Sequence, residues 1–236
     1  VGGTGLFEGR FIRDYLTIPA SGEPAQIRWG EFYRLDRGRI VEVFCLLDLV
    51  DLMEQAGQNV LPARRGKPHC YPPPAAGDWV MLDIQDERTT RDSLQHIRAF
   101  IFEGLNAYDE QGLESMGMAG FFDPGVQWYG PGGIGACDSF RQFEEQHQSH
   151  WLRAFPDRKV QDLDALIAEG PYSGGPGWAG VAATPRGEYL GVPATGNRIE
   201  VNGLDFWKRD GEAIIENWVF VDMVHLFRQL GVDLLD

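Results

Sequence analysis

The clearest pattern along the chain lies near its C-terminus, at residues 211–231. Residues 213–221 are mostly β-branched or aromatic, which is typical of a buried strand. Asp222 follows where a helix N-cap belongs, apolar residues then recur at helical spacing, and Gly231 ends the run. The pattern therefore predicts a strand that leads directly into a short helix.

The same pattern occurs earlier, at residues 38–57, and the similarity extends to either side of it. Residues 15–57 align without a gap on residues 189–231, so each residue matches the one 174 positions later. The identical pairs include Tyr15 and Tyr189, Leu16 and Leu190, Phe32 and Phe206, Glu42 and Glu216, Asp48 and Asp222, and Gln55 and Gln229. A repeat of this length indicates two copies of one domain.

We therefore expect residues 1–60 to form the C-terminal part of a first domain, 61–88 a Pro-rich linker, and 89–236 a complete second domain. Half a domain cannot bury its own sheet. Either the sequence begins inside a longer protein, which we favour, or another chain supplies the missing part.

The hydrophobic pattern predicts the elements of both segments. In the first segment we expect strands at 5–16, 26–35 and 39–47 and a helix at 49–55. In the second we expect helices at 90–109, 113–121 and 138–154, strands at 126–129, 160–169, 178–184, 198–209 and 213–221, and a last short helix. This order predicts an α+β fold in which helices pack on one face of a curved antiparallel sheet.

Composition narrows the classes of function. The formal net charge of −14 argues against nucleic acid and against an anionic membrane surface as partners. Three widely spaced cysteines form neither a disulfide framework nor a zinc pattern, which fits a reducing cytoplasm. The glycines of 130–135 lack the Gly-Lys-Ser/Thr ending of a phosphate loop, so we expect no nucleotide there.

Several short motifs together resemble the SnoaL-like polyketide cyclase family, which has the cone-shaped fold of nuclear transport factor 2. They are Trp128-Tyr129-Gly130-Pro131, Gly133-Ile134-Gly135, Ala154-Phe155-Pro156-Asp157, Pro193-Ala194-Thr195-Gly196, Phe206-Trp207, Glu216-Asn217-Trp218 with Asp222, and Gln229-Leu230-Gly231. The chain looks most similar to the tandem branch of the family. This resemblance implies two copies that pair sheet to sheet as a pseudo-dimer; whether chains also form a homodimer is left open.

The resemblance also implies a reaction. Characterised members close a polyketide ring by an aldol step without metal or cofactor, using an aspartate on the last strand and a histidine on the strand before it. The corresponding places in this chain are Val219 and Asp205, and in the first copy Cys45 and Glu31. Because valine cannot move a proton, that mechanism does not transfer unchanged.

Strand alternation assigns faces to the last strand. If Val219 faces into the cone, Asn217 does too, while Trp218 and Phe220 face outward and are expected to bury against the other copy's sheet. Asp205 is then the leading acid/base candidate, because apolar walls would raise the pKa of its carboxyl group. Asn217 is expected to polarise a carbonyl or to hold Asp205.

The remaining candidates are aromatic or sit on helices. Tyr129, Trp128, Trp178 and Trp207 are expected to line the cavity as stacking walls, although core packing is the alternative for each. His147 is expected to line the pocket; its spacing from His150 also allows a metal pair, but we expect no metal. Asp222 is either a ligand contact or, more simply, a helix cap.

The sequence thus predicts a cytoplasmic SnoaL-like protein that binds a small hydrophobic cyclic or aromatic carbonyl compound. The predicted activity is cofactor-independent proton transfer of the cyclase or isomerase type, with Asp205, Asn217 and His147 as catalytic candidates. The alternative is a non-catalytic binding or assembly module of the same fold, because a fold does not by itself determine function.

Overall fold

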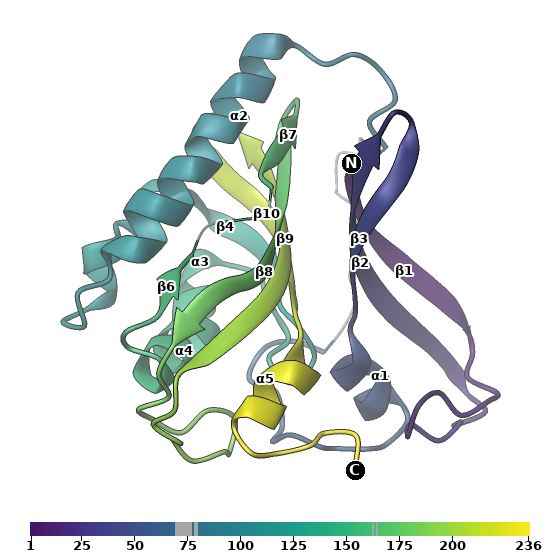
Figure 1. Ribbon diagram of the computed structural model, residues 1–236. Coiled ribbons are helices and arrows are strands. Elements are labelled where there is room, and N and C mark those ends of the chain that lie inside the picture. The colour runs from purple at the N-terminus through teal and green to yellow at the C-terminus, as the bar shows by residue number, and fades with distance from the viewer. Residues whose placement is uncertain (69–76, 78–79, 162, 164) are drawn as a thin grey trace.

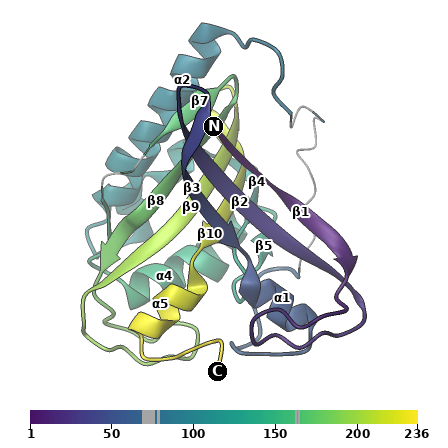
Figure 2. The ribbon, with the colours of Figure 1, turned by 45° about the vertical axis from the view of Figure 1, so that its right-hand side comes forward.

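The computed structural model describes residues 1–68, 77, 80–161, 163 and 165–236. The chain has an α+β fold with a three-stranded and a seven-stranded sheet. Figures 1 and 2 show that the two sheets face each other and that α2 (Glu87–Ala99) covers the other face of the larger sheet. No helix of the described residues is long and apolar enough to cross a membrane.

The smaller sheet contains the N-terminal strands in the order β1-β2-β3, all antiparallel. Their bounds are β1 Gly2–Arg10, β2 Pro24–Asp36 and β3 Arg39–Leu47, followed by helix α1 Leu49–Gln55. The predicted bounds of β3 and α1 are confirmed. The first strand begins and ends earlier than predicted, because residues 11–22 turn back to reach β2.

The helical layer comes next along the chain. After α2, the helix continues through a π turn at Phe100–Gly104 into a short 3₁₀ turn. A second continuous helix consists of α3 Phe140–Phe143, a π turn at Glu144–Gln148 and α4 Ser149–Ala154. The predicted helix at 113–121 is two 3₁₀ turns, separated by Gly117 in the left-handed conformation at φ 59°.

The larger sheet has the order β5-β4-β10-β9-β8-β6, and β7 also pairs with β8. The strands are β4 Phe122–Tyr129, β5 Ala136–Cys137, β6 Lys159–Val160, β7 Ile167–Glu169, β8 Tyr172–Ala183, β9 Ile199–Asp210 and β10 Ala213–Val221, and helix α5 Met223–Gln229 follows.

Two predictions about this sheet were wrong. The sheet is mixed rather than antiparallel, because β4 lies parallel to β10. The helix at 140–154 carries the chain from β5 at one edge of the sheet to β6 at the opposite edge, and the later strands then return to β4. The predicted strand at 160–169, of which 162 and 164 lie outside the described residues, is two short strands that pair with opposite ends of β8.

Each sheet makes the same local contacts with the helix that follows it, at positions that match in the sequence alignment. Gln55 exchanges two hydrogen bonds with the backbone of Gln26, and Gln229 does the same with Glu200. Asp48 and Asp222 each cap the helix that follows a sheet's last strand. The two segments that align in sequence therefore fold alike where their strands meet their helices.

An apolar layer fills the space between the sheets. Trp218 and Phe220 are buried there, as strand alternation predicts. They pack with Phe32 and Leu46, whereas Val43 is exposed. Phe32 comes from β2 and Leu46 from β3, and Phe44 of β3 also packs against this cluster, so both strands contribute to the contact.

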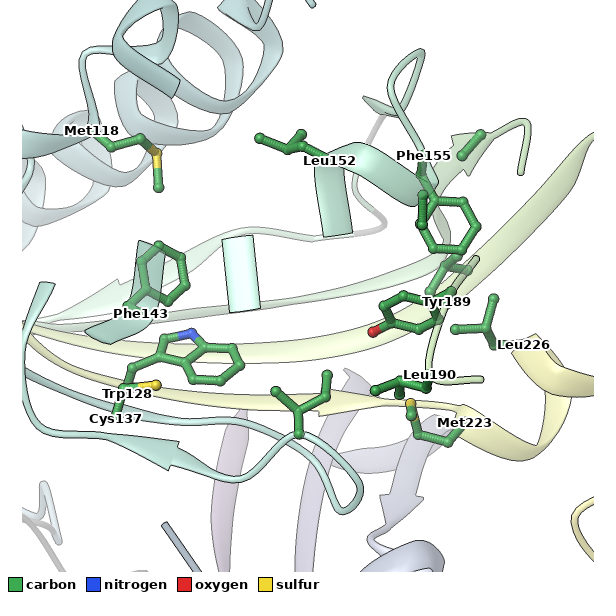
Figure 3. Close-up of a cluster of buried hydrophobic side chains, with 14 of the residues drawn as sticks. Met118, Trp128, Cys137, Phe143, Leu152, Phe155, Tyr189, Leu190, Met223 and Leu226 are labelled. Atoms are coloured by element: carbon green, nitrogen blue, oxygen red, sulfur yellow. The ribbon is translucent and has the colours of Figure 1, made fainter. Parts of the chain in front are cut away.

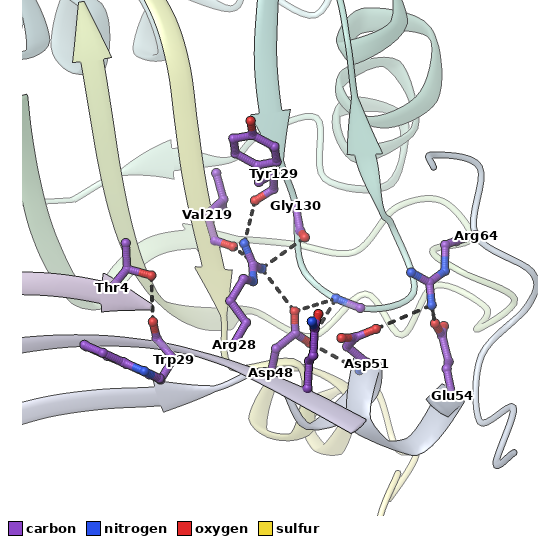
Figure 4. Close-up of polar contacts among 12 residues, drawn as sticks. Thr4, Arg28, Trp29, Asp48, Asp51, Glu54, Arg64, Tyr129, Gly130 and Val219 are labelled. Atoms are coloured by element: carbon purple, nitrogen blue, oxygen red, sulfur yellow. Dashed lines mark hydrogen bonds and ion pairs between the residues drawn. The ribbon is translucent and has the colours of Figure 1, made fainter. Parts of the chain in front are cut away.

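Arg28 of β2 joins the two sheets through polar contacts (Figure 4). Its guanidinium group donates to the backbone carbonyls of Tyr129, Gly130 and Val219 at 2.8–3.0 Å. It also forms an ion pair with Asp48 at 3.0 Å, and both side chains are buried. One buried cation therefore satisfies carbonyl groups of β4, of the loop after it and of β10, together with the carboxylate that caps α1.

The glycines of 130–135 have a structural role in this contact. Asp48 accepts hydrogen bonds from the backbone N–H of Gly132 at 3.0 Å, and a Cβ on Gly132 would lie 2.3 Å from the Asp51 backbone nitrogen. The loop contains glycine because α1 approaches its backbone closely.

The predicted linker begins as ordered chain. Leu61 is buried, and Arg64 forms ion pairs with Asp51 and Glu54 of α1. Lys67 forms a backbone bridge with Ala136. Cys45 is exposed and Cys137 is buried, while Cys70 lies outside the described residues.

Candidate functional site

A cavity of about 180 Å³ lies between the concave face of the larger sheet and the helical layer. Its walls come from β4, β8, β9 and β10 on the sheet side and from residues 100–105 and the helix at 140–154 on the other. Most of its lining is apolar or aromatic, and Trp128, Phe143 and Tyr189 of this wall are visible in Figure 3. The curved sheet and its helices thus enclose a small space that suits an apolar ligand.

Asp205 lies on β9 and lines this cavity. It stands opposite Val219 of β10 and Gly175 of β8, so it is in the middle of the sheet. Burial raises the pKa of its carboxyl group from 3.8 to about 7, although hydrogen bonding from Asn217 lowers it in part. A carboxyl group with this pKa exchanges protons near neutral pH.

Asn217 of β10 is buried and also lines the cavity. Its side-chain amide donates to the backbone carbonyl of Phe206 at 3.0 Å, and its hydrogen bonding also acts on the Asp205 carboxyl group. Asn217 therefore lies close enough to Asp205 to lower its pKa, and the two predicted roles of this amide both stay predictions.

His147 comes from the π turn of the helix opposite the sheet. Its ring stacks on Trp128 with centroids 4.5 Å apart and planes 19° from parallel. Burial lowers the pKa of the imidazole to about 3, and the nearby charge of Arg158 adds to this effect. The ring is therefore neutral at physiological pH and can offer one hydrogen-bond donor and one acceptor.

Six of the nine predicted site residues meet in the cavity: Asp205, Asn217, His147, Trp128, Trp207 and Val219. They come from three strands and a helix, so the fold brings together residues up to 91 positions apart, from Trp128 to Val219. The alternation along β10 and the register of β9 place them as the sequence predicts.

The other three predicted residues lie elsewhere. Tyr129 is buried between the two sheets and stacks on Trp218, because neighbouring residues on a strand face opposite ways and Trp128 takes the cavity side. Trp178 is 41% exposed, because β8 has an irregularity between Gly177 and Val181 where Ala179 adopts φ 62°. Asp222 caps α5 by accepting from the His225 backbone N–H at 3.0 Å.

Two polar residues of the cavity wall were missed by the sequence analysis. Arg158, just after the helix at 140–154, is 3% exposed, and Gln148 is 4% exposed. Nothing in the local pattern marks Arg158 as buried, because it stands between a turn and a charged strand start. The helical spacing of Gln148 from Glu144, Trp151 and Leu152 was a usable signal that its side chain faces inward.

The described residues contain no group of three or more histidine, cysteine, aspartate or glutamate side chains placed to hold a metal ion. His147 stacks on Trp128, and both His147 and His150 line a separate small pocket near Arg65. Among the described residues, the titratable and amide side chains of the cavity wall are one carboxyl group, one imidazole, one phenol, two amides and one guanidinium group.

Comparisons with known proteins agree with this geometry. The family model for SnoaL-like polyketide cyclases matches residues 107–230. No curated protein matches the chain.

Among solved structures, the chain is similar to a protein of Jannaschia sp. CCS1 assigned as a SnoaL-like polyketide cyclase. The two chains are 16% identical with a TM-score of 0.53, and the match covers 64% of this chain and 99% of the other. It is also similar to AclR of Streptomyces galilaeus, assigned as a hydroxylase, with 20% identity, a TM-score of 0.49, and coverage of 60% and 97%. At 16% identity the Jannaschia structure bears on the fold alone. Because the family model spans more than half of its residues, the chain belongs to the SnoaL-like polyketide cyclase family.

Proposed function

We propose that this protein binds a small hydrophobic cyclic or aromatic carbonyl compound in its cavity and transfers a proton to or from it. The single observation that carries the proposal is Asp205, a carboxyl group in an apolar cavity with a pKa of about 7. Perturbed carboxyl groups of this kind are typical of acid/base catalysis.

The proposed step needs only groups that the cavity wall supplies. The ionised Asp205 carboxylate takes a proton from the carbon next to the ligand carbonyl, and the C–H electron pair forms an enolate. Return of that proton to another atom of the enolate completes an isomerisation. Alternatively, attack of the enolate carbon on a second carbonyl closes a ring, and the Asp205 carboxyl group returns its proton to the alkoxide that forms. The neutral ring of His147 is a donor for the carbonyl oxygen. No metal or organic cofactor takes part in this proposal.

The cavity volume limits the ligand. A cavity of about 150 Å³ holds one benzene molecule, and this cavity measures about 180 Å³. The stacked pair of Trp128 and His147 suits a flat ring against it. The proposed ligand is therefore a compound with a single ring, much smaller than a multi-ring polyketide.

One observation favours a second candidate, a non-catalytic binding module. Val219 lines the cavity at the place where, by the family resemblance, characterised members carry their acid/base aspartate. Asp205 would then be a buried polar residue that orients a ligand without moving a proton.

We further propose that residues 1–60 are the C-terminal part of a second SnoaL-like unit that pairs with the complete one. The matching glutamine clamps and aspartate caps support this, as does the face-to-face packing around Phe32 and Phe220. Pairing through the backs of the sheets leaves the cavity on the opposite face of the larger sheet.

The test of function is hydrogen–deuterium exchange at the methyl group of acetophenone, an aromatic ketone of suitable size, followed by NMR in heavy water. We expect the wild-type protein to accelerate exchange, with a rate that rises as pH increases through about 7, where Asp205 loses its proton.

The matched variants are Asp205→Asn, which keeps the shape but cannot accept the proton, and Asp210→Asn at the exposed end of the same strand. Asp205→Asn should lose the acceleration and Asp210→Asn should keep it. Equal acceleration by Asp205→Asn and wild type would exclude Asp205 as the base. Acetophenone binding without any acceleration would support the binding module instead.

A further inference from the structure

Arg158 is the least expected member of the cavity wall. Its side chain is almost fully buried, at 3% exposed, and lines the cavity. Within the part of the chain that the structure describes, it has no carboxylate partner. Its two polar contacts are a hydrogen bond from Nη1 to the Leu105 carbonyl at 2.9 Å and a contact from Nη2 to the Met116 sulfur at 3.2 Å.

These contacts leave much of the guanidinium group's capacity unused. A guanidinium group has five N–H donors, arranged to bind a carboxylate through two parallel hydrogen bonds. A thioether sulfur is a weak acceptor, so only the Leu105 carbonyl is a strong partner. Burial lowers the pKa of Arg158 to about 10, which still leaves the side chain charged at neutral pH.

A buried charge without a counter-ion is costly, and proteins normally pair it. Arg28 provides the contrast within this chain, because it is equally buried but has the Asp48 carboxylate and three carbonyl groups around it. Arg28 is thus a structural arginine with its partners inside the chain. Arg158 instead has the surroundings of a binding group whose partner is a ligand.

The groups near Arg158 are compatible with an anion. Gln148 is a buried amide that lines the same cavity and contacts the same Met116 sulfur, at 3.7 Å. His147 lies close enough for the charge of Arg158 to affect its pKa. Asp205, the acidic residue of the cavity wall, forms no ion pair with Arg158. The cavity therefore has a cationic group on one side and the proposed proton-transfer group, the Asp205 carboxyl, on another.

We infer that the ligand of this cavity is an acid: a single-ring carbonyl compound that carries a carboxylate, which Arg158 binds while the enolisable carbon faces Asp205. The placement of the enolisable carbon at Asp205 rests on the proposed function, whereas the carboxylate subsite rests on Arg158 alone. It restricts the ligand from any hydrophobic carbonyl compound to the carboxylate-bearing ones.

The test compares two probes that have nearly the same shape and differ in charge. Acetylbenzoate carries the carboxylate, acetylbenzamide replaces it by a neutral amide, and each is used as its meta and para isomers. Binding to the wild-type protein, to Arg158→Met and to Arg158→Lys is measured by isothermal titration calorimetry. Arg153→Met, which removes an exposed arginine of the preceding helix, is the control.

We expect wild type and Arg153→Met to bind one acetylbenzoate isomer about tenfold or more tightly than the matching amide, since charge-assisted hydrogen bonds are stronger than neutral ones. In Arg158→Met the preference should disappear while the amide still binds. Arg158→Lys should retain part of the preference, because it keeps the charge but not the two parallel donors.

Failure of this inference can be distinguished from failure of the proposed function. Equal affinities for the two probes in wild type, or a preference that survives in Arg158→Met, would overturn the carboxylate subsite and leave the exchange test of Asp205 unaffected. Preferential binding of acetylbenzoate without methyl exchange would retain the subsite and overturn proton transfer. A wild-type protein that binds neither probe would overturn the carboxylate subsite, and the acetophenone exchange test would decide proton transfer separately.

Discussion

The pKa of Asp205 has a consequence for stability that can be measured without any ligand. In the folded protein the carboxyl group holds its proton up to about pH 7, whereas in the unfolded chain it releases it near its ordinary value of 3.8. Between these two pH values the folded state binds one more proton than the unfolded state. The contribution of Asp205 to stability is therefore fully present at low pH and is lost as pH rises through about 7.

The magnitude follows from the size of the shift. One pKa unit corresponds to about 1.4 kcal/mol, so the free energy of unfolding should fall by about 1.4 kcal/mol for each pH unit across this range. Between about pH 5 and about pH 8 the expected loss is about 3 kcal/mol relative to a protein with a neutral group at this position. Asp205→Asn supplies that neutral group with almost the same shape.

The assay is urea denaturation of wild type and Asp205→Asn at several pH values between about 5 and 8. All other titrating groups are common to both proteins, so their effects cancel in the difference between the two unfolding free energies. This difference should shift by about 3 kcal/mol in favour of the variant as pH rises, and Asp210→Asn should follow wild type. A difference that stays constant across this range would refute the argument that burial raises the pKa of Asp205.

Three further predictions concern the contact between the sheets and the cavity wall. Arg28→Met should lower the free energy of unfolding by about 3 kcal/mol or more, because it leaves the buried Asp48 carboxylate unpaired. Arg34→Met, at an exposed ion pair, should change it by less than about 1 kcal/mol. Similar losses for both variants in urea denaturation would contradict this prediction. Gly30→Ala should lower the free energy of unfolding by about 1–3 kcal/mol, because its Cβ would lie 2.9 Å from the ring of Phe220 in the facing sheet. Gly3→Ala is the control, since its Cβ would meet nothing within 4 Å. Equal melting temperatures for the two variants would contradict the close contact. The imidazole of His147, with a pKa of about 3, should keep constant NMR shifts from about pH 5 to pH 8, and titration in this range would show that the ring is solvated.

The site was predictable where one strand and its register were sufficient. Alternation along β10 placed Asn217 and Val219 in the cavity and Trp218 and Phe220 between the sheets, as the structure shows. The same rule, applied to β4, would have removed Tyr129 from the predicted cavity wall, because Trp128 precedes it directly.

The local features of the fold could be predicted from the order of residues alone. The strand–cap–helix units at both ends of the repeat, with Asp48 and Asp222 as caps, depend on hydrogen bonds between residues three positions apart. Short-range patterns of this kind appear directly in the order of residues. The family motifs added the fold class of residues 107–230.

The features that depend on long-range packing could not be predicted from the sequence and are visible only in the folded chain. The parallel pairing of β4 with β10, the irregularity of β8 that exposes Trp178, and the burial of Arg158 all depend on segments that are distant in the sequence. Arg28 stands between Ile27 and Trp29 and Arg158 between Asp157 and Lys159, and neither local pattern predicts what surrounds the buried guanidinium group. Arg28 is buried against a carboxylate, whereas Arg158 is buried against a cavity, because different parts of the chain close around them.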